Sequence, residues 1–122
     1  MSKVLFVTGK CGSGKTTLAK QAAAYDGWRC RLYDGIFNDA DWSLPAHPLE
    51  VELIVVDHVG YAPAAEVQKV VAWCQENKVQ LMLAEQTRAD IEKVVGPLPA
   101  DELKLVGPKE PPQFVEASTA QN

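Results

Sequence analysis

Hydrophobic residues in this chain gather into short runs separated by polar and glycine-containing segments. Residues 4–8, 53–56 and 79–84 are almost continuously apolar, which is typical of parallel strands covered on both faces. Residues 28–33 alternate between two sets of side chains, and this period of two predicts a half-buried strand. Residues 103–106 are a candidate for a last strand.

Three segments between these runs have the pattern of helices. Residues 16–24 contain neither glycine nor proline, and Pro63 stands where proline best begins a helix. The helix after Pro63 carries an apolar stripe at the spacing i, i+3, i+4, i+7, made of Val67, Val70, Val71 and Cys74. That position makes Cys74 a core residue rather than a reactive thiol. Thr87 and Asp90 have the spacing of a capping box before a third helix.

Strands that alternate with helices predict an α/β fold. We expect three layers, with a mostly parallel sheet of four to five strands flanked by helices. Residues 1–106 would form one domain, and residues 107–122, rich in proline and small polar residues, would form a disordered tail. Residues 36–50 have no sustained period, and we expect a loop with at most one helical turn.

Composition narrows the class of protein. The chain has 122 residues and a formal net charge of −4, so it has no overall basic field, and we expect nucleic acid to be contacted only locally or through a partner. Its three cysteines are odd in number and lack C-x-x-C spacing, which argues against a disulfide framework and against zinc. The first apolar run is too short for a signal sequence or a membrane span. We expect a cytoplasmic protein.

One segment predicts specific chemistry. Residues 9–17 contain the pattern G-x-x-x-x-G-K-[ST] between an expected strand and an expected helix, as Gly9, Lys10, Cys11, Gly12, Ser13, Gly14, Lys15, Thr16 and Thr17. Glycines let the backbone turn its N–H groups around an oxyanion, and the helix adds its own unpaired N–H groups. Lys15 would reach the β- and γ-phosphates, and the Thr16 hydroxyl would ligate Mg²⁺.

A second signal lies about forty residues further on. The apolar run at 53–56 ends in Asp57, which is the Walker B pattern, and its carboxylate would hold the magnesium ion opposite Thr16. Asp57 to Gly60 also reads D-x-x-G, so Gly60 is either a γ-phosphate sensor or a loop glycine. His58 occupies the place of the catalytic glutamate of many motor ATPases, which leaves no obvious group to orient the attacking water.

With both elements in place, residues 3–95 resemble the P-loop NTPase superfamily. The resemblance implies a nucleotide at the carboxyl edge of the sheet. It also implies that Asp34, at the end of the second strand, touches Mg²⁺ or a second substrate, the alternative being a turn-forming Asp-Gly pair. RecA-like and hexameric DNA-translocating ATPases have a γ-phosphate sensor after the strand that corresponds to 79–84. Gln86, or else Glu85, is therefore the candidate, unless it is a strand-end polar residue without a role.

Two narrower resemblances concern a lysine and an arginine. The string from Lys10 to Thr16 is similar to the deviant Walker A loop K-G-G-x-G-K-[ST] of plasmid-partition, septum-site and nitrogenase-iron proteins, except for Cys11. In that group the first lysine reaches the nucleotide of a facing subunit, which would make Lys10 catalytic in a nucleotide-dependent homodimer; otherwise it is an exposed loop charge. Thr87 to Asp90 resembles the guanine-reading T-K-x-D box, although the helix cap is the favoured interpretation, and Arg88 is a candidate charge-neutralising group.

The function expected from these patterns is Mg²⁺-dependent ATP hydrolysis, coupled to a partner or to DNA, plasmid or phage handling. The catalytic residues would be Lys15, Asp57, Gln86 and Lys10, and the metal ligands Thr16, Asp57 and Asp34. One alternative is a small-molecule or nucleotide kinase with Asp34 as the acceptor-side base. Another is a nucleotide-binding switch that hydrolyses little.

Overall fold

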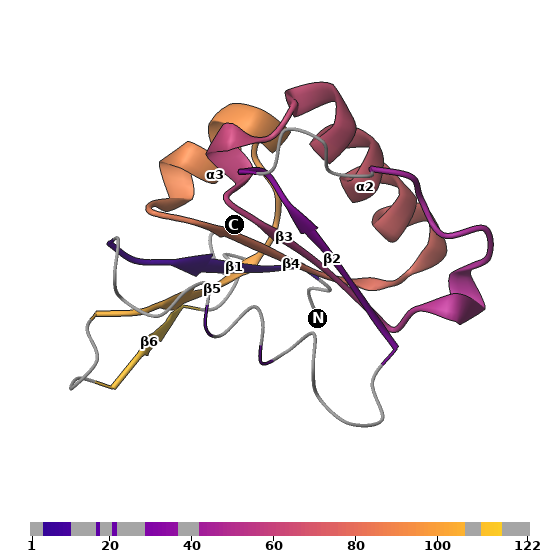
Figure 1. Cartoon of the computed structure of the whole chain (residues 1–122). Helices are drawn as coiled ribbons and strands as arrows, with labels where there is room; N and C mark the ends of the chain where they lie inside the picture. Colours follow the sequence, from indigo (N-terminus) through magenta and orange to yellow (C-terminus); the bar gives the residue numbers. More distant parts are fainter. Residues whose placement is uncertain are drawn as a thin grey trace.

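Six strands form one sheet in the order β2-β3-β4-β1-β5-β6 (Figure 1). The computed structural model describes residues 4–10, 17, 21, 29–36, 42–106 and 111–115. The first five strands run parallel and β6 pairs antiparallel with β5. Their bounds are β1 Val4–Thr8, β2 Cys30–Asp34, β3 Leu53–Asp57, β4 Gln80–Glu85, β5 Asp101–Lys104 and β6 Gln113–Val115.

The α/β class and the mostly parallel sheet are confirmed, but the expected strand count was too low. The sixth strand, β6, lies within the segment that we expected to be a tail, and it adds an antiparallel edge beside β5. All three of its residues are exposed, so hydrophobic periodicity could not indicate it. The domain boundary itself stays a prediction.

The middle strands are buried on both faces, as their apolar runs predicted. All five residues of β3 are buried. Ile54 and Val56 belong to the main core, and Leu53 and Val55 belong to a second cluster on which Met82 packs. Two-sided burial of this kind is typical of parallel strands within an α/β sheet.

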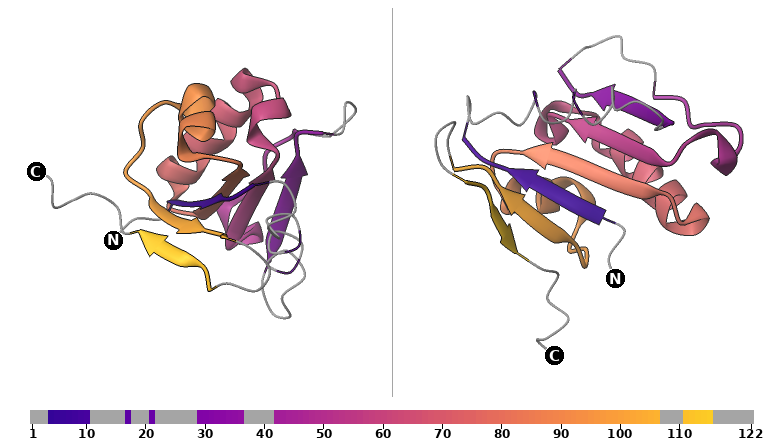
Figure 2. Two further views of the ribbon diagram at one scale, coloured as in Figure 1. Left: turned by 90° about the vertical axis from the view of Figure 1, so that its left-hand side faces the viewer. Right: turned by 90° about the horizontal axis from the view of Figure 1, so that it is seen from below.

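Helices α2 (Ala64–Asn77) and α3 (Arg88–Val95) lie on the same side of the sheet (Figures 1 and 2). The apolar stripe of α2 is buried in full, so the core position of Cys74 is confirmed. At the start of α3, Thr87 Oγ1 accepts a hydrogen bond from Asp90 N at 3.1 Å, which confirms the helix cap. In the helix predicted over 16–24, only Thr17 and Gln21 are described, and both are helical and exposed.

Strand β2 is half-buried, as predicted, and the side chain that it buries is Tyr33 rather than Leu32. Tyr33 is 3% exposed, whereas Leu32 is 37% exposed. The reason lies in the following loop, which folds back so that the Trp42 ring stacks on Tyr33 at 5.1 Å and the Tyr33 hydroxyl donates to Ser43 O at 2.6 Å. The helical turn allowed for in that loop is present as the 3₁₀ helix η1, Pro48–Glu50.

Among the described residues, neither helix combines the length and the apolar character that a membrane span requires.

The buried thiol of Cys74 gives a pH-dependent prediction. Burial raises its pKa from 9.0 to about 12. Between these values the unfolded thiol has lost its proton while the folded thiol keeps it. Raising the pH therefore lowers the free energy of unfolding, with a slope that approaches about 1.4 kcal/mol per pH unit.

Denaturant unfolding of the wild type and Cys74→Ala from pH 7 to pH 10.5 measures this effect. The difference between the two proteins should be constant below about pH 9 and should fall above it. Other titrating groups, including Cys30, are common to both proteins and cancel. A difference that stays flat to pH 10.5 would contradict the buried, protonated thiol.

Candidate functional site

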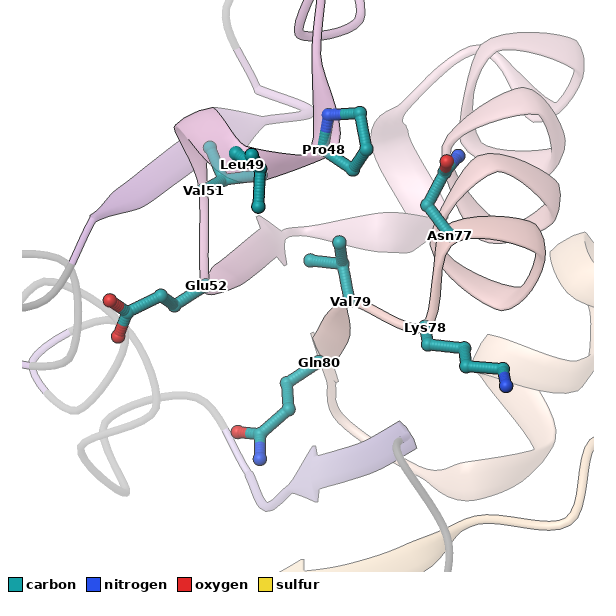
Figure 3. Close-up of a pocket in the computed structure, with 8 residues that line it drawn as sticks. All are labelled: Pro48, Leu49, Val51, Glu52, Asn77, Lys78, Val79 and Gln80. Atoms are coloured by element: carbon teal, nitrogen blue, oxygen red, sulfur yellow. The ribbon is translucent and has the colours of Figure 1, made fainter.

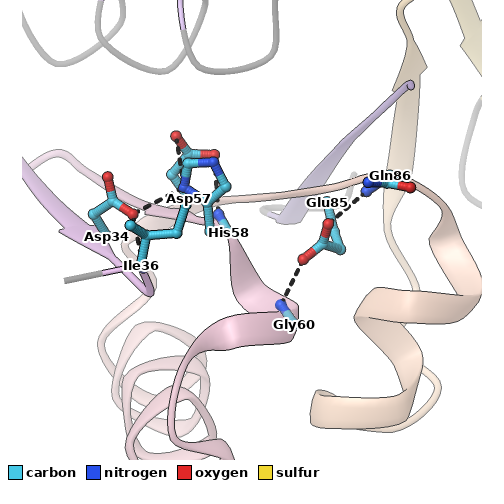
Figure 4. A network of polar contacts seen from close by, with 7 residues as sticks. All are labelled: Asp34, Ile36, Asp57, His58, Gly60, Glu85 and Gln86. Carbon is cyan, nitrogen blue, oxygen red and sulfur yellow. Dashed lines mark hydrogen bonds and ion pairs between the residues drawn. The ribbon is translucent and has the colours of Figure 1, made fainter. Parts of the chain in front are cut away.

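The carboxyl ends of the parallel strands meet at one edge of the sheet, where α/β proteins bind ligands. Strand β2 ends in Asp34, β3 in Asp57 and β4 in Glu85. Asp34 pairs with Asp57, and Thr8 at the end of β1 pairs with Glu85. Three carboxylates from neighbouring strands therefore line this edge beside the start of the predicted phosphate-binding loop (Figure 4).

The start of that loop is anchored to β4. Gly9 has a φ of 154°, which glycine adopts readily, and its N–H donates to Gln86 O at 3.0 Å. Lys10 follows and is exposed. Cys11, Gly12, Ser13, Gly14, Lys15 and Thr16 lie outside the described residues, and their predicted roles stay predictions.

The two predicted metal-binding aspartates lie together, with a histidine between them. Asp57 has only 3% of its side chain exposed, and its Oδ1 accepts the His58 N–H at 3.0 Å. The His58 ring turns back, so that Nδ1 lies 2.9 Å from Asp34 Oδ1 and 3.5 Å from Asp57 Oδ2. One potential ligand atom from each residue lies within 4.8 Å of the other two.

From the sequence, His58 was notable only because it occupies the place of the catalytic glutamate of many motor ATPases. Its backbone is left-handed, with φ 53° and ψ 50°, and this conformation directs the ring toward β2 rather than along the chain. A signal was available, because Asp34 and Asp57 end two strands and His58 comes directly after one of them. What could not be known from sequence is that β2 and β3 are neighbours.

A glycine holds the two strand ends close together. The Gly35 N–H donates to Asp57 O at 2.9 Å, just after β2. A Cβ atom at Gly35 would lie 2.3 Å from His58 O and 2.8 Å from Ala62 N. Both neighbours are backbone atoms and cannot simply rotate away, so this crossing requires glycine.

Glu85 joins β4 to the 3₁₀ helix η2, Val59–Tyr61. Its buried carboxylate accepts the Gly60 N–H at 2.7 Å through Oε2 and the Gln86 N–H at 2.9 Å through Oε1 (Figure 4). The amide of Gly60, a candidate γ-phosphate sensor, is therefore occupied by Glu85 in this structure. Gln86, the first sensor candidate, is exposed at the same edge.

Arg88, the candidate charge-neutralising group, is held by contacts within the fold, and its role at the site stays a prediction. Its guanidinium donates to Leu98 O at 3.0 Å and to Ala100 O at 3.1 Å. It also lies 4.6 Å from the centre of the buried Phe6 ring. These contacts tie α3 to the segment that leads into β5.

Two hollows lie at opposite edges of the sheet. A hollow of about 690 Å³ beside the loop start is lined in part by Gly9, Lys10, Gln86, Lys104 and Leu105. A smaller one of about 490 Å³ lies at the amino edge and is lined in part by Leu49, Lys78 and Gln80 (Figure 3). Only the first lies at the edge that carries the three carboxylates.

Comparison with family models and with curated proteins gave no match. Among solved structures the chain is similar to Pif1 helicases. Bacteroides Pif1 in complex with ADP-AlF4 matches at 16% identity with a TM-score of 0.53, and Bacteroides Pif1 bound to ssDNA matches at 16% identity with a TM-score of 0.51. A structure of two coordinating Pif1 helicases at forked dsDNA matches at 15% identity with a TM-score of 0.52. Each match covers 84% of this chain and 37–39% of the helicase, so the chain spans less than two fifths of their length. The chain has a P-loop NTPase-like fold.

The close crossing at Gly35 gives a stability prediction. We expect Gly35→Ala to lower the free energy of unfolding by about 2–3 kcal/mol, because overpacking forces backbone to move. Gly96→Ala is the comparison for backbone strain without a close contact. Its φ of 78° and ψ of 177° lie in a region essentially restricted to glycine, with open space around it, and the substitution should cost about 1–3 kcal/mol. A loss below about 1 kcal/mol for Gly35→Ala in chemical denaturation would contradict the close crossing.

Proposed function

We propose that this chain binds ATP with Mg²⁺ at the carboxyl edge of its sheet and hydrolyses it. The observation that carries the proposal is the position of the loop start. Gly9 is hydrogen-bonded to Gln86 at the end of β4, and Asp57 ends the next strand. A loop that begins there would present its phosphate-binding amides at the same edge as the carboxylates.

The side chains at this edge suit a hard divalent cation, which takes carboxylate and hydroxyl oxygens. The Asp57 side chain is buried, and among the described residues its ion-pair partner is His58, whose Nδ1 lies 3.5 Å from Oδ2. No described lysine or arginine forms an ion pair with it, and a bound cation would balance its charge. Asp57, Asp34 and the Thr16 hydroxyl are the residues that would hold Mg²⁺, which when bound offsets the negative charge of the phosphates.

The loop residues would bind the phosphates. The amides of Gly9, Gly12 and Gly14 would face the oxyanions, and Lys15 would add the positive charge. Cys11, Ser13 and Thr17 complete the segment that wraps the phosphates. Lys10 is proposed as the residue that reaches a facing subunit or partner.

The hollow beside the loop start offers room for the rest of the nucleotide. It is lined by residues at or next to the ends of β4, β1 and β5, and its β5 side lies beyond β1 from Asp57, which ends β3. Strands are ~4.8 Å apart, so Asp57 and β5 are ~14 Å apart across the edge. An extended nucleoside triphosphate would cross β4 and β1 with its phosphates over the loop.

Hydrolysis by these groups alone should be slow. No described carboxylate follows Asp57 to orient water, and both oxygens of Glu85 already accept backbone amides. Gln86, with its exposed side chain at the same edge, is proposed to orient the water near the γ-phosphate. A nucleotide-dependent homodimer or a larger partner would then supply the missing group. Similarity to DNA helicases makes DNA, plasmid or phage handling the proposed setting.

A switch that hydrolyses little is the second candidate, because the Gly60 amide is held by Glu85. A γ-phosphate that competed for this amide would release η2 from β4. Single-turnover measurement with excess protein separates the candidates, since a switch retains its ATP uncleaved.

The kinase alternative is less favoured, because the proposed base Asp34 already accepts a hydrogen bond from Ile36 N and contacts His58.

Removal of the loop lysine tests the proposal. Lys15→Ala should weaken ATP binding by about 10- to 100-fold, the equivalent of about 1.5–3 kcal/mol for a charged hydrogen bond. Asp57→Asn should abolish the Mg²⁺ dependence of binding and turnover. Calorimetry and phosphate release measure both effects. Lys69→Ala, which removes an exposed lysine from α2, is the control and should change nothing. Unchanged affinity and turnover in Lys15→Ala would overturn the proposal.

A further inference from the structure

We propose that Asp34, Asp57 and His58 form a protein-held site for a divalent first-row transition ion of the Mn²⁺ type, which binds before any nucleotide. The inference deepens the proposed function and rests on it for the role of Asp57. It differs in adding a nitrogen ligand, His58, to the two aspartates, and in having the ion bind without the nucleotide. The three residues come from the ends of β2 and β3 (Figure 4).

The distances between the potential ligand atoms match those around a single ion. Ligands ~2.1 Å from a metal lie ~3.0 Å apart at a right angle and ~3.4 Å apart at a tetrahedral angle. His58 Nδ1 lies 2.9 Å from Asp34 Oδ1 and 3.5 Å from Asp57 Oδ2. One small ion could therefore replace these contacts without a change of backbone.

A separate observation points to a cation. The Asp57 side chain is 3% exposed, and among the described residues only His58 pairs with it, through its N–H at 3.0 Å from Oδ1 and its Nδ1 at 3.5 Å from Oδ2. The same Nδ1 also contacts Asp34 Oδ1, and a buried ionised carboxylate costs several kcal/mol unless a cation balances its charge. Among the described residues no lysine or arginine lies within ion-pair distance of Asp57 or Asp34. A divalent ion would balance both carboxylates at once.

The donor set selects the class of ion. Mg²⁺ favours oxygen ligands and keeps much of its water, whereas imidazole suits first-row transition ions. One imidazole with two carboxylates is a mixed set, which Mn²⁺ and its neighbours accept more readily than Mg²⁺. His58 is therefore the residue that would separate the two classes.

The ligands are already held in place. His58 has a left-handed backbone, and its ring packs edge-on against Tyr61 at 6.3 Å. The Ile36 N–H donates to Asp34 Oδ1 at 3.0 Å, and the Gly35 N–H donates to Asp57 O at 2.9 Å. An ion that enters a preformed site loses little free energy to ordering, which favours binding in the absence of nucleotide.

Titration of the nucleotide-free protein with Mn²⁺, followed by the EPR signal of the free ion, tests the inference. The wild type should bind one Mn²⁺ per chain, at least tenfold more tightly than Mg²⁺ in competition. His58→Ala keeps both carboxylates and should weaken Mn²⁺ at least tenfold while Mg²⁺ affinity changes less than twofold. Asp34→Asn, which preserves shape, should weaken both ions. His47→Ala removes the other histidine of the chain and should bind as the wild type does.

NMR places the ion, since bound Mn²⁺ should broaden the amide signals of Gly35 and His58 first. Absence of saturable Mn²⁺ binding, or equal affinity in His58→Ala and the wild type, would overturn the inference. Should His58→Ala fail to fold, Asp34→Asn with wild-type Mn²⁺ affinity would overturn it equally. ATP binding that depends on Lys15 without a Mn²⁺ site would leave the proposed function standing. A Mn²⁺ site without ATP binding would remove the proposed function and keep the metal site.

Discussion

Parallel pairing of β1, β3 and β4 is the constraint on which the rest of this structure depends. The paired residues Phe6 and Leu83, and likewise Val56 and Leu83, are buried. A slip of one residue between β3 and β4 would draw the Asp57 carboxylate into the core or push apolar side chains out, and either change costs several kcal/mol. Burial of the strands thus sets where their polar ends lie.

The insertion of β4 between β1 and β3 gives the edge its chemical layout. Glu85 and Gln86 lie between the loop start at Gly9 and the carboxylate of Asp57. The Gly9 N–H donates to the backbone oxygen of Gln86, and the Gly60 N–H donates to the side chain of Glu85. Two hydrogen bonds and one peptide bond therefore connect η2 to the start of the predicted phosphate-binding loop. Any coupling between bound nucleotide and a partner at η2 would use this route.

Sequence reasoning was most successful where a single period dominates. The apolar run that ends in Asp57 and the stripe after Pro63 predicted β3 and α2 within a residue or two, because burial alone determines such patterns. Strand β2 was harder, since its alternation does not say which set of side chains is buried, and Tyr33 is covered by a loop tryptophan that stacks on it. Strand β6 has no buried side chain and left no hydrophobic signal.

Spatial neighbours explain the remaining differences in the candidate site. The sequence predicted Asp34 and Asp57 as metal ligands, but strand order is absent from a linear pattern, so His58 was not placed between them. The hydrogen bonds of Arg88 to Leu98 O and Ala100 O could not be predicted either, because sequence does not distinguish one backbone carbonyl from another. Contacts between a side chain and a distant part of the backbone can be identified only from the three-dimensional structure.

Hydrogen–deuterium exchange with and without Mg²⁺ and a non-hydrolysable ATP analogue tests the central claim, that a triphosphate binds at the carboxyl edge of this sheet. The account predicts slower exchange over residues 9–17 and at the strand ends near Asp57 and Gln86, with no change at residues 48–52 and 77–80 around the opposite edge. Protection confined to the opposite edge, or no protection of residues 9–17 at saturating analogue, would contradict it.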